Sequence, residues 1–131
     1  MNAFFDTNIL VYAQQIGAKG EKARALFARG GKISVQVLNE FAAVSRRKHN
    51  KDWSEIADAI TDALALVDSP LPLSLDLHKA ARRIAEVHGL SFYDALIVAA
   101  AIESGCDTLY SEDMQHGRKF GGLAIVDPFA P

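Results

Sequence analysis

The stretch 91-SFYDALIVAAAIES-104 contains the longest apolar run in the sequence, from Ala95 to Ile102. A helix over these residues would be apolar on almost every side, so it must be buried nearly all round. The run is also far shorter than the roughly 20 residues that a membrane-spanning helix needs. We therefore expect residues 91–104 to form the central helix of a globular domain.

Four short segments around this helix have the character of buried strands: residues 3–6 (AFFD), 32–35 (KISV), 107–110 (DTLY) and 123–126 (LAIV). Helical patterns separate them, at residues 9–15, 21–29, 36–49, 53–67 and 75–88. Strands that alternate with helices favour a mostly parallel sheet covered by helices on both faces. The predicted fold class is α/β, a three-layer α/β/α domain around a mostly parallel central sheet.

The composition fits a single globular domain over residues 1–131. Half of the residues are hydrophobic and 23% are charged, and no repeat or low-complexity linker divides the chain. The first residues lack the pattern of a signal peptide, and the lone Cys106 cannot form an internal disulfide, so we expect a cytoplasmic location without a membrane anchor. A net charge of −2 excludes a uniformly basic nucleic-acid-binding module.

Glu40 interrupts the apolar face of the helix expected at residues 36–49. Val37, Phe41 and Val44 have helical spacing, and position 40 falls on their face. A carboxylate there is costly unless it is paired or bound to a cation. The nearby arginines do not lie one turn away on that face, so we expect no local partner. Glu40 either bends out to solvent at the edge of the apolar face or belongs to a site.

Asp94 opens the central helix. Ser91 and Asp94 have the spacing of a capping box, with Asp in place of the usual Glu, so Asp94 could complete the helix N-terminus. A carboxylate in the first turn of a buried helix could equally belong to a site. The two roles are compatible.

Asp6 and Asp113 follow two of the predicted strands, where an open parallel sheet binds its ligands. Each also has a plain structural interpretation, Asp6 as a helix cap and Asp113 as a turn residue beside Ser111. Four separate structural roles are together less plausible than one shared site. The sequence therefore predicts an acidic site made of Asp6, Glu40, Asp94 and Asp113.

Carboxylates without His or Cys select hard cations such as Mg²⁺ or Mn²⁺ rather than Zn²⁺. Such a site suits phosphodiester hydrolysis, because a bound metal ion lowers the pKa of its water and a second ion can stabilise the leaving oxygen. Like charges this close oppose joint ionisation. We therefore expect at least one carboxyl pKa to be raised, and the metal-free fold to be destabilised near neutral pH.

The four acidic residues stand in an ordered series of motifs that resembles the PIN-domain family. The motifs are Asp6-Thr7-Asn8, Asn39-Glu40-Phe41, Tyr93-Asp94-Ala95-Leu96-Ile97 and Ser111-Glu112-Asp113, and the resemblance covers essentially the whole chain. Chain length and motif order look like those of VapC toxins from bacterial toxin–antitoxin pairs. Many family members carry a further Asp two residues after the fourth acid, where this chain has Gln115.

The resemblance implies a magnesium-dependent endoribonuclease that forms homodimers and is neutralised by a cognate antitoxin. It maps the metal-binding, catalytic role onto Asp6, Glu40, Asp94 and Asp113, and a supporting role onto Asn8 and Ser111. Two basic patches could contact the RNA. They are Arg46, Arg47 and Lys48, and then Arg118 and Lys119 in a loop expected at residues 116–122. The first patch could instead be a solvated helix C-terminus.

Two other functions stay open on the residues alone. One is a phosphatase that uses Asp6 as a phosphoaspartyl nucleophile, although that chemistry usually has a second Asp where position 8 is Asn. The other is a non-catalytic binding module that retains the fold. An intact set of four acids disfavours the second.

Overall fold

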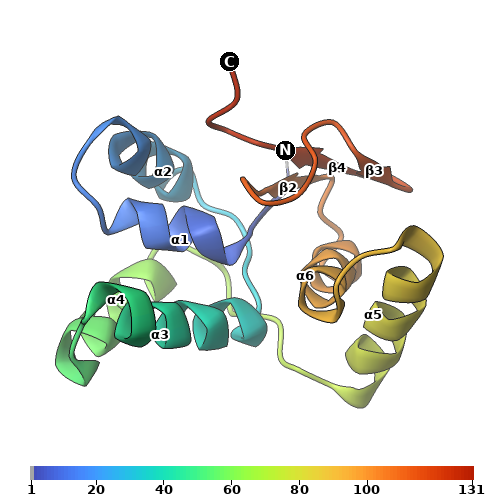
Figure 1. Ribbon diagram of the computed structural model, residues 1–131, viewed down its shortest axis with the longest axis horizontal. Helices are drawn as coiled ribbons and strands as arrows, with labels where there is room; N and C mark the ends of the chain where they lie inside the picture. The colour runs from blue at the N-terminus through green and yellow to red at the C-terminus, as the bar shows by residue number, and fades with distance from the viewer. Residues whose placement is uncertain (1) are drawn as a thin grey trace.

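The computed structural model describes residues 2–131 and contains a four-stranded sheet (Figure 1). The strands β1 (Ala3–Phe5), β2 (Thr108–Tyr110) and β4 (Leu123–Val126) run parallel, and β3 (Lys119–Phe120) pairs antiparallel with β4. Their order across the sheet is β1-β2-β4-β3. The prediction of a mostly parallel sheet is confirmed.

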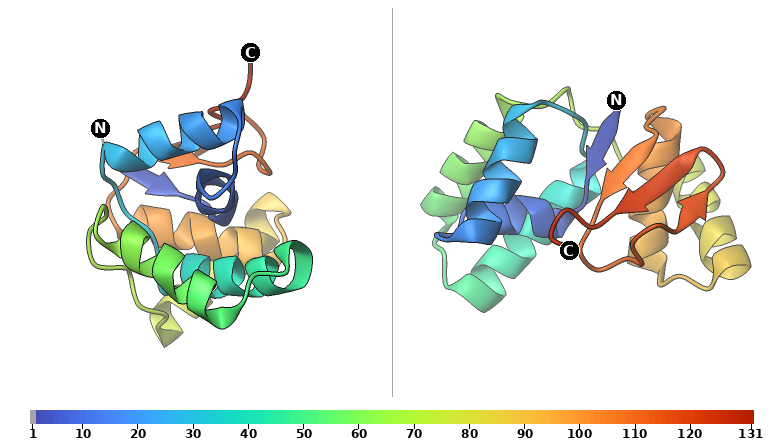
Figure 2. Two further views of the ribbon diagram at one scale, coloured as in Figure 1. Left: turned by 90° about the vertical axis from the view of Figure 1, so that its left-hand side faces the viewer. Right: turned by 90° about the horizontal axis from the view of Figure 1, so that it is seen from above.

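Helices cover both sides of this sheet. They are α1 (Thr7–Ala13), α2 (Ala18–Ala28), α3 (Val35–His49), α4 (Trp53–Leu64), α5 (Leu75–His88) and α6 (Phe92–Glu103). Figure 2 (left) shows α2 on one side of the sheet and α6 on the other, with α3 and α4 on the α6 side. Helix α5 packs along α6. This is the predicted three-layer α/β/α architecture.

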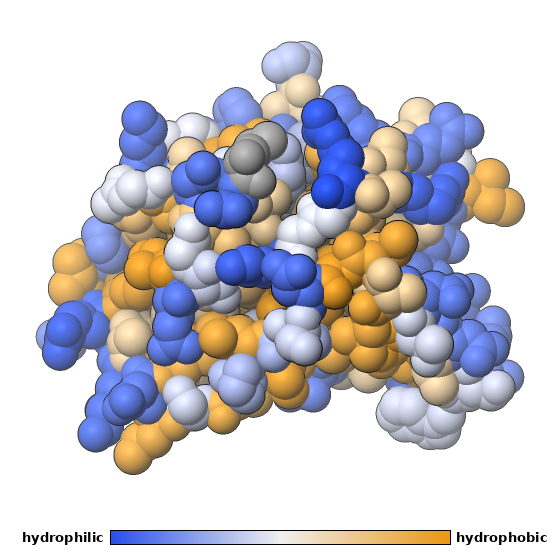
Figure 3. Space-filling model, turned by 180° about the vertical axis from the view of Figure 1, so that it is seen from behind, coloured by the Kyte–Doolittle hydropathy of each residue, from blue (hydrophilic) through white to orange (hydrophobic). Residues whose placement is uncertain are grey.

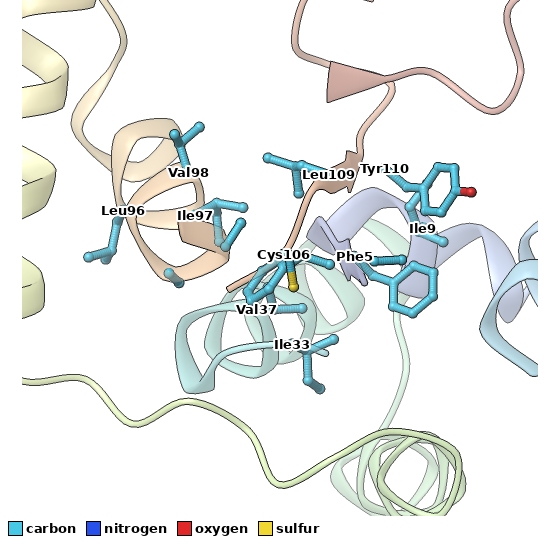
Figure 4. Close-up of a cluster of buried hydrophobic side chains, with 14 of the residues drawn as sticks. Phe5, Ile9, Ile33, Val37, Leu96, Ile97, Val98, Cys106, Leu109 and Tyr110 are labelled. Atoms are coloured by element: carbon cyan, nitrogen blue, oxygen red, sulfur yellow. The ribbon is translucent and has the colours of Figure 1, made fainter. Parts of the chain in front are cut away.

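The core is built on the alternation of side chains along the strands. Phe5 of β1 contacts Phe27 of α2 with ring centroids 4.8 Å apart and stacks on Tyr110 of β2 with centroids 5.9 Å apart. Leu109 points to the opposite face, toward Ile97 of α6 (Figure 4). Every residue of α6 from 95 to 101 is buried, so α6 is the central helix that its apolar run predicted.

Residues 32–35 do not form the predicted strand. Lys32 makes an isolated parallel bridge to Phe4, and Ser34 makes one to Leu71. Helix α3 begins inside the predicted strand, which leaves too few residues for a continuous ladder. The segment nevertheless runs beside β1, where the prediction placed an extended chain.

Gly31 explains how the chain comes so close to β1. Its φ is +154°, and a Cβ atom there would lie 2.5 Å from a ring carbon of Phe5 and 2.9 Å from the carbonyl oxygen of Ala3. Both contacts are shorter than a side chain tolerates, so the position requires glycine.

The helix ends follow local capping chemistry. Helix α5 has its predicted bounds, and Gly89 ends it in the left-handed conformation with φ of 68°. Helices α1 and α2 begin at Thr7 and Ala18, rather than at residues 9 and 21. Helix α4 ends at Leu64, before the predicted residue 67.

The predicted loop at residues 116–122 contains the short strand β3, which was missed because only two residues pair. Among residues 2–131 no single helix is both long and apolar enough to cross a membrane. Helices α5 and α6 meet that test only as a pair, across a bend of 116°.

Candidate active site

Asp6 lies at the carboxyl end of β1 and is buried, with 5% of its surface exposed. Because Phe5 pairs with Tyr110 in the parallel ladder, the next residues, Asp6 and Ser111, lie side by side. The Ser111 hydroxyl donates to Asp6 Oδ2 at 2.7 Å, and the Thr7 backbone N–H donates to Oδ1 at 2.7 Å. Both oxygens of Asp6 are therefore held in place, and Asp6 is also the N-cap of α1.

Glu40 projects from the otherwise apolar face of α3 and is half-buried. Gln36 Nε2 donates to Glu40 Oε2 at 3.0 Å, and Thr7 Oγ1 donates to Oε1 at 3.3 Å. The expectation that Glu40 lacks a local partner is wrong, because Gln36 lies one turn earlier on the same helix. Thr7 ties Glu40 to the residue that follows Asp6.

Asp94 is half-buried in the first turn of α6. Its backbone N–H donates to Ser91 Oγ at 3.3 Å, which is one half of a capping box. The returning bond, from the Ser91 N–H to the Asp94 carboxylate, is absent among residues 2–131, whereas Asp52 and Glu55 form both bonds at the start of α4. Ser91 therefore caps α6, and the Asp94 carboxylate is not used as a cap.

Asp113 is exposed and lies two residues beyond Ser111. Its backbone N–H donates to Ser111 Oγ at 3.3 Å, and its Oδ2 accepts from Asn8 Nδ2 at 3.1 Å. Asn8 Oδ1 in turn accepts from the backbone N–H of Glu112 at 3.3 Å. Asn8 and Ser111 thus connect the segments that follow β1 and β2.

One open cleft of about 320 Å³ is lined by all four predicted acids. A fifth carboxylate, Glu112, lines it as well, and Lys48 and His49 at the end of α3 supply the basic side chains. The remaining lining residues are Thr7, Asn8, Val11, Tyr12, Gln15 and Val44. Residues far apart in sequence therefore meet at the carboxyl end of β1 and β2.

Burial raises the pKa of Asp6 from 3.8 to about 7. The hydrogen bonds from Ser111 and Thr7 oppose this rise in pKa, and the negative charges of Glu40 and Asp94 add to it. The pKa of Glu40 is also raised, mainly by burial and less by the charges of Asp94 and Asp113. A raised carboxyl pKa was predicted, but its main cause is burial rather than repulsion between the acids.

The donor set suits a hard divalent cation by its chemistry, because the cleft offers several carboxylate oxygens. Within residues 2–131 no three Asp, Glu, His or Cys side chains converge closely enough to hold an ion as they stand. The arrangement is that of an open acidic cleft.

The family model of the PIN domain matches residues 3–119. The chain belongs to the PIN-domain family. A comparison of this chain with curated proteins found no match.

Three solved structures share the fold of this PIN domain. A toxin–antitoxin complex from Klebsiella pneumoniae aligns with a TM-score of 0.73 at 20% identity, over 98% of each chain. VapBC2 from Rickettsia felis, bound to a DNA fragment from its promoter, gives 0.68 at 22% identity over 95% of this chain and 97% of that one. The sarcin–ricin-loop-cleaving toxin VapC20 of Mycobacterium tuberculosis gives 0.66 at 22% identity, over 86% and 90%. At such identities the likeness shows the fold.

The basic residues predicted to bind RNA are spread over the PIN domain rather than gathered at the cleft. Of these five residues, only Lys48 lines the cleft. Arg46 donates to the carbonyl oxygen of Lys51 and lies over the Trp53 ring, which fits the alternative of a helix C-terminus. Arg47 and Lys119 are exposed away from the cleft lining. Arg118 donates to the His88 carbonyl oxygen at 2.6 Å, on the α5 side of the domain.

Sequence reasoning did not single out the partners of Glu112. Tyr12 and Lys19 both bond its carboxylate, at 2.6 Å and 2.5 Å. These contacts join residues about a hundred positions apart, so no local spacing signals them. Gln36 could have been found, since its spacing from Glu40 is that of neighbours on a helix.

Proposed function

We propose that this PIN domain is a divalent-metal-dependent endoribonuclease, the toxin of a toxin–antitoxin pair. The observation that carries the proposal is the shared cleft, where Asp6, Glu40, Asp94 and Asp113 meet at the carboxyl end of two parallel strands. Membership of the PIN-domain family and the fold shared with solved toxins support it. Mg²⁺ is the proposed ion, with Mn²⁺ able to replace it.

The four acids would hold the cation, and hydrogen bonds fix three of them to different degrees. Asp6 is buried and fixed by two hydrogen bonds, Glu40 is fixed by two more, and Asp113 is exposed with one bond from Asn8. A bound cation would supply an activated water for attack on the phosphodiester and would offset the negative charge that otherwise repels RNA. Lys48, at the rim, would contact a phosphate of the bound strand.

Position 8 does not support the phosphatase alternative, because that chemistry usually has a second Asp there and this chain has Asn8. Asn8 instead donates a hydrogen bond to the Asp113 carboxylate and accepts one from the Glu112 backbone N–H. Trapping a phosphorylated Asp6 would overturn the ribonuclease proposal.

We also propose that an antitoxin blocks the cleft. An acidic cleft suits an inserted Arg, which pairs bidentately with carboxylates and would displace the cation. A co-complex that leaves Asp94 open to solvent would contradict the proposed role of the antitoxin.

Homodimer formation is proposed as well, because large apolar side chains, among them Leu64, Leu66 and Leu75, are exposed. Apolar patches also interrupt the polar surface seen from behind (Figure 3). A monomer in sedimentation analysis would contradict the homodimer.

Cleavage of structured RNA by variants that differ in one carboxylate tests the proposed function. Asp94→Asn should abolish cleavage and keep a native circular dichroism spectrum, since its carboxylate makes no capping bond. Asp58→Asn, at an exposed acid of α4 outside the cleft, is the matched control and should cleave normally. Chelator should silence the wild type, and Mg²⁺ or Mn²⁺ should restore it. Wild-type cleavage by purified Asp94→Asn would refute the assignment.

A further inference from the structure

Among residues 2–131, Glu112 is the one acid of the cleft that forms an ion pair with a basic side chain of the protein. Lys19 Nζ donates to its Oε2 at 2.5 Å, and the Tyr12 hydroxyl donates to its Oε1 at 2.6 Å. The two oxygens are thus bound from α2 and from α1.

Lys19 is held by more than this ion pair. Its ammonium lies 4.8 Å from the centroid of the Tyr12 ring and 5.2 Å from that of Phe129. The two rings meet edge to face with centroids 5.1 Å apart. Two aromatic rings and one carboxylate therefore define the place of a lysine at the rim of the cleft.

A short chain of hydrogen bonds leads from the backbone of Glu112 to the carboxylate of Asp113. The Glu112 backbone N–H donates to Asn8 Oδ1 at 3.3 Å, and Asn8 Nδ2 donates to Asp113 Oδ2 at 3.1 Å. Asp113 is exposed and has no other side-chain bond among the described residues. The orientation of its carboxylate thus depends on Asn8, and that of Asn8 depends on the backbone at Glu112.

We propose that Lys19 and Glu112 form a positioning pair for the cation site. Lys19, with the Tyr12 hydroxyl, keeps the Glu112 carboxylate out of the ligand set. The pair also fixes residue 112, whose backbone N–H orients Asn8 and with it Asp113. The inference rests on the proposed function and deepens it. Exposed ion pairs contribute little to fold stability. With side chains 52% and 25% exposed, this pair is better explained by the geometry it imposes at the site. Groups behind metal ligands commonly act in this way.

Calorimetric titration of the metal-free protein with Mg²⁺ tests the pair. The variant Lys19→Met/Glu112→Gln removes one positive and one negative charge, so the net charge of the protein is unchanged while the ion pair that holds residue 112 is lost. We expect Mg²⁺ to bind roughly tenfold more weakly, the scale typical of such supporting residues. The matched control is Glu21→Gln/Lys22→Met, at two exposed residues of α2 outside the cleft, which should bind like the wild type.

Wild-type affinity in the Lys19→Met/Glu112→Gln variant would overturn the inference and leave the proposed function intact. Absence of Mg²⁺ binding by the wild type would instead refute the proposed function, and the positioning pair with it. Should the double variant fail to fold in chelator, Tyr12→Phe removes one hydroxyl from Glu112 and should weaken binding in the same direction. An unchanged Tyr12→Phe affinity would then count against the pair.

Discussion

Replacing Asp6 with Asn should stabilise the metal-free protein above neutral pH. Burial raises the pKa of Asp6 to about 7, so the folded protein retains a proton that the unfolded chain releases near pH 4. The sign follows from this difference: stability falls as the pH rises from about 4 to about 7 and is level above that. An Asn side chain does not titrate and escapes this loss.

The magnitude follows from the two pKa values, 3.8 and about 7. At pH 8 the ionisation of Asp6 costs the fold about 4 kcal/mol, and at pH 5 about 2 kcal/mol. Asn keeps the acceptor for the Thr7 N–H, but its Nδ2 donor replaces the oxygen to which the Ser111 hydroxyl donates. Ser111 Oγ already accepts from the backbone N–H groups of Asp113 and Met114, so the new donor finds no free partner there. That loss is worth about 1 kcal/mol. The net gain is about 3 kcal/mol at pH 8, or roughly 10 °C in Tm for a chain of this length.

Thermal unfolding in chelator, followed by circular dichroism at pH 8 and pH 5, measures the gain. Asp58→Asn again serves as the control for removal of an exposed negative charge. Equal melting of Asp6→Asn and wild type at pH 8 would refute the reasoning. A gain of the same size at both pH values would refute it too, because it would then arise from something other than ionisation.

Two further predictions concern ligands of the cleft. In the inactive Asp94→Asn background, Lys48→Ala should weaken RNA binding and lower its salt dependence by about one counterion, whereas Arg118→Ala should change neither. Fluorescence anisotropy over a range of salt concentrations measures both quantities, and equal effects of the two variants would contradict the placement of Lys48 at the RNA-binding cleft. Mg²⁺ affinity should fall by roughly tenfold per pH unit below pH 7, because Asp6 must lose its proton to bind a cation. Calorimetry giving the same affinity at pH 6 and pH 8 would contradict a cation site that requires deprotonation of Asp6.

The parts of the site that follow from backbone rules could be predicted from the sequence. Asp6 and Asp113 were placed together because they follow strands, and the parallel register of Phe5 with Tyr110 is what brings Asp6 beside Ser111. Glu40 stood out as a charge on an apolar helix face, and the structure places it at the cleft. Helical periodicity and the ends of strands are local properties of the chain, so they can be recognised in a single sequence.

The parts that depend on contacts across the fold could not be predicted. Residues 32–35 have strand-like composition, yet the N-cap at Ser34 starts α3 and leaves only bridges. The pair of Lys19 and Glu112 is made by packing of α2 and the C-terminal tail against the rim. The cause of the raised Asp6 pKa was likewise hidden, because sequence spacing shows that charges meet but not how deeply one of them is buried.

The cost of the site and the geometry of the site lie in different residues. The energetic penalty sits at Asp6, where burial opposes ionisation and a bound cation would offset it. The geometric control sits at the exposed end, where Asp113 depends on Asn8 and the pair of Lys19 and Glu112. Changes at Asp6 should therefore move the stability of the metal-free fold, and changes at Lys19 should move cation affinity with little effect on that stability. Measuring fold stability and cation affinity on the same variants would show whether the energetic cost of the site comes from the burial of Asp6 or from repulsion between its carboxylates.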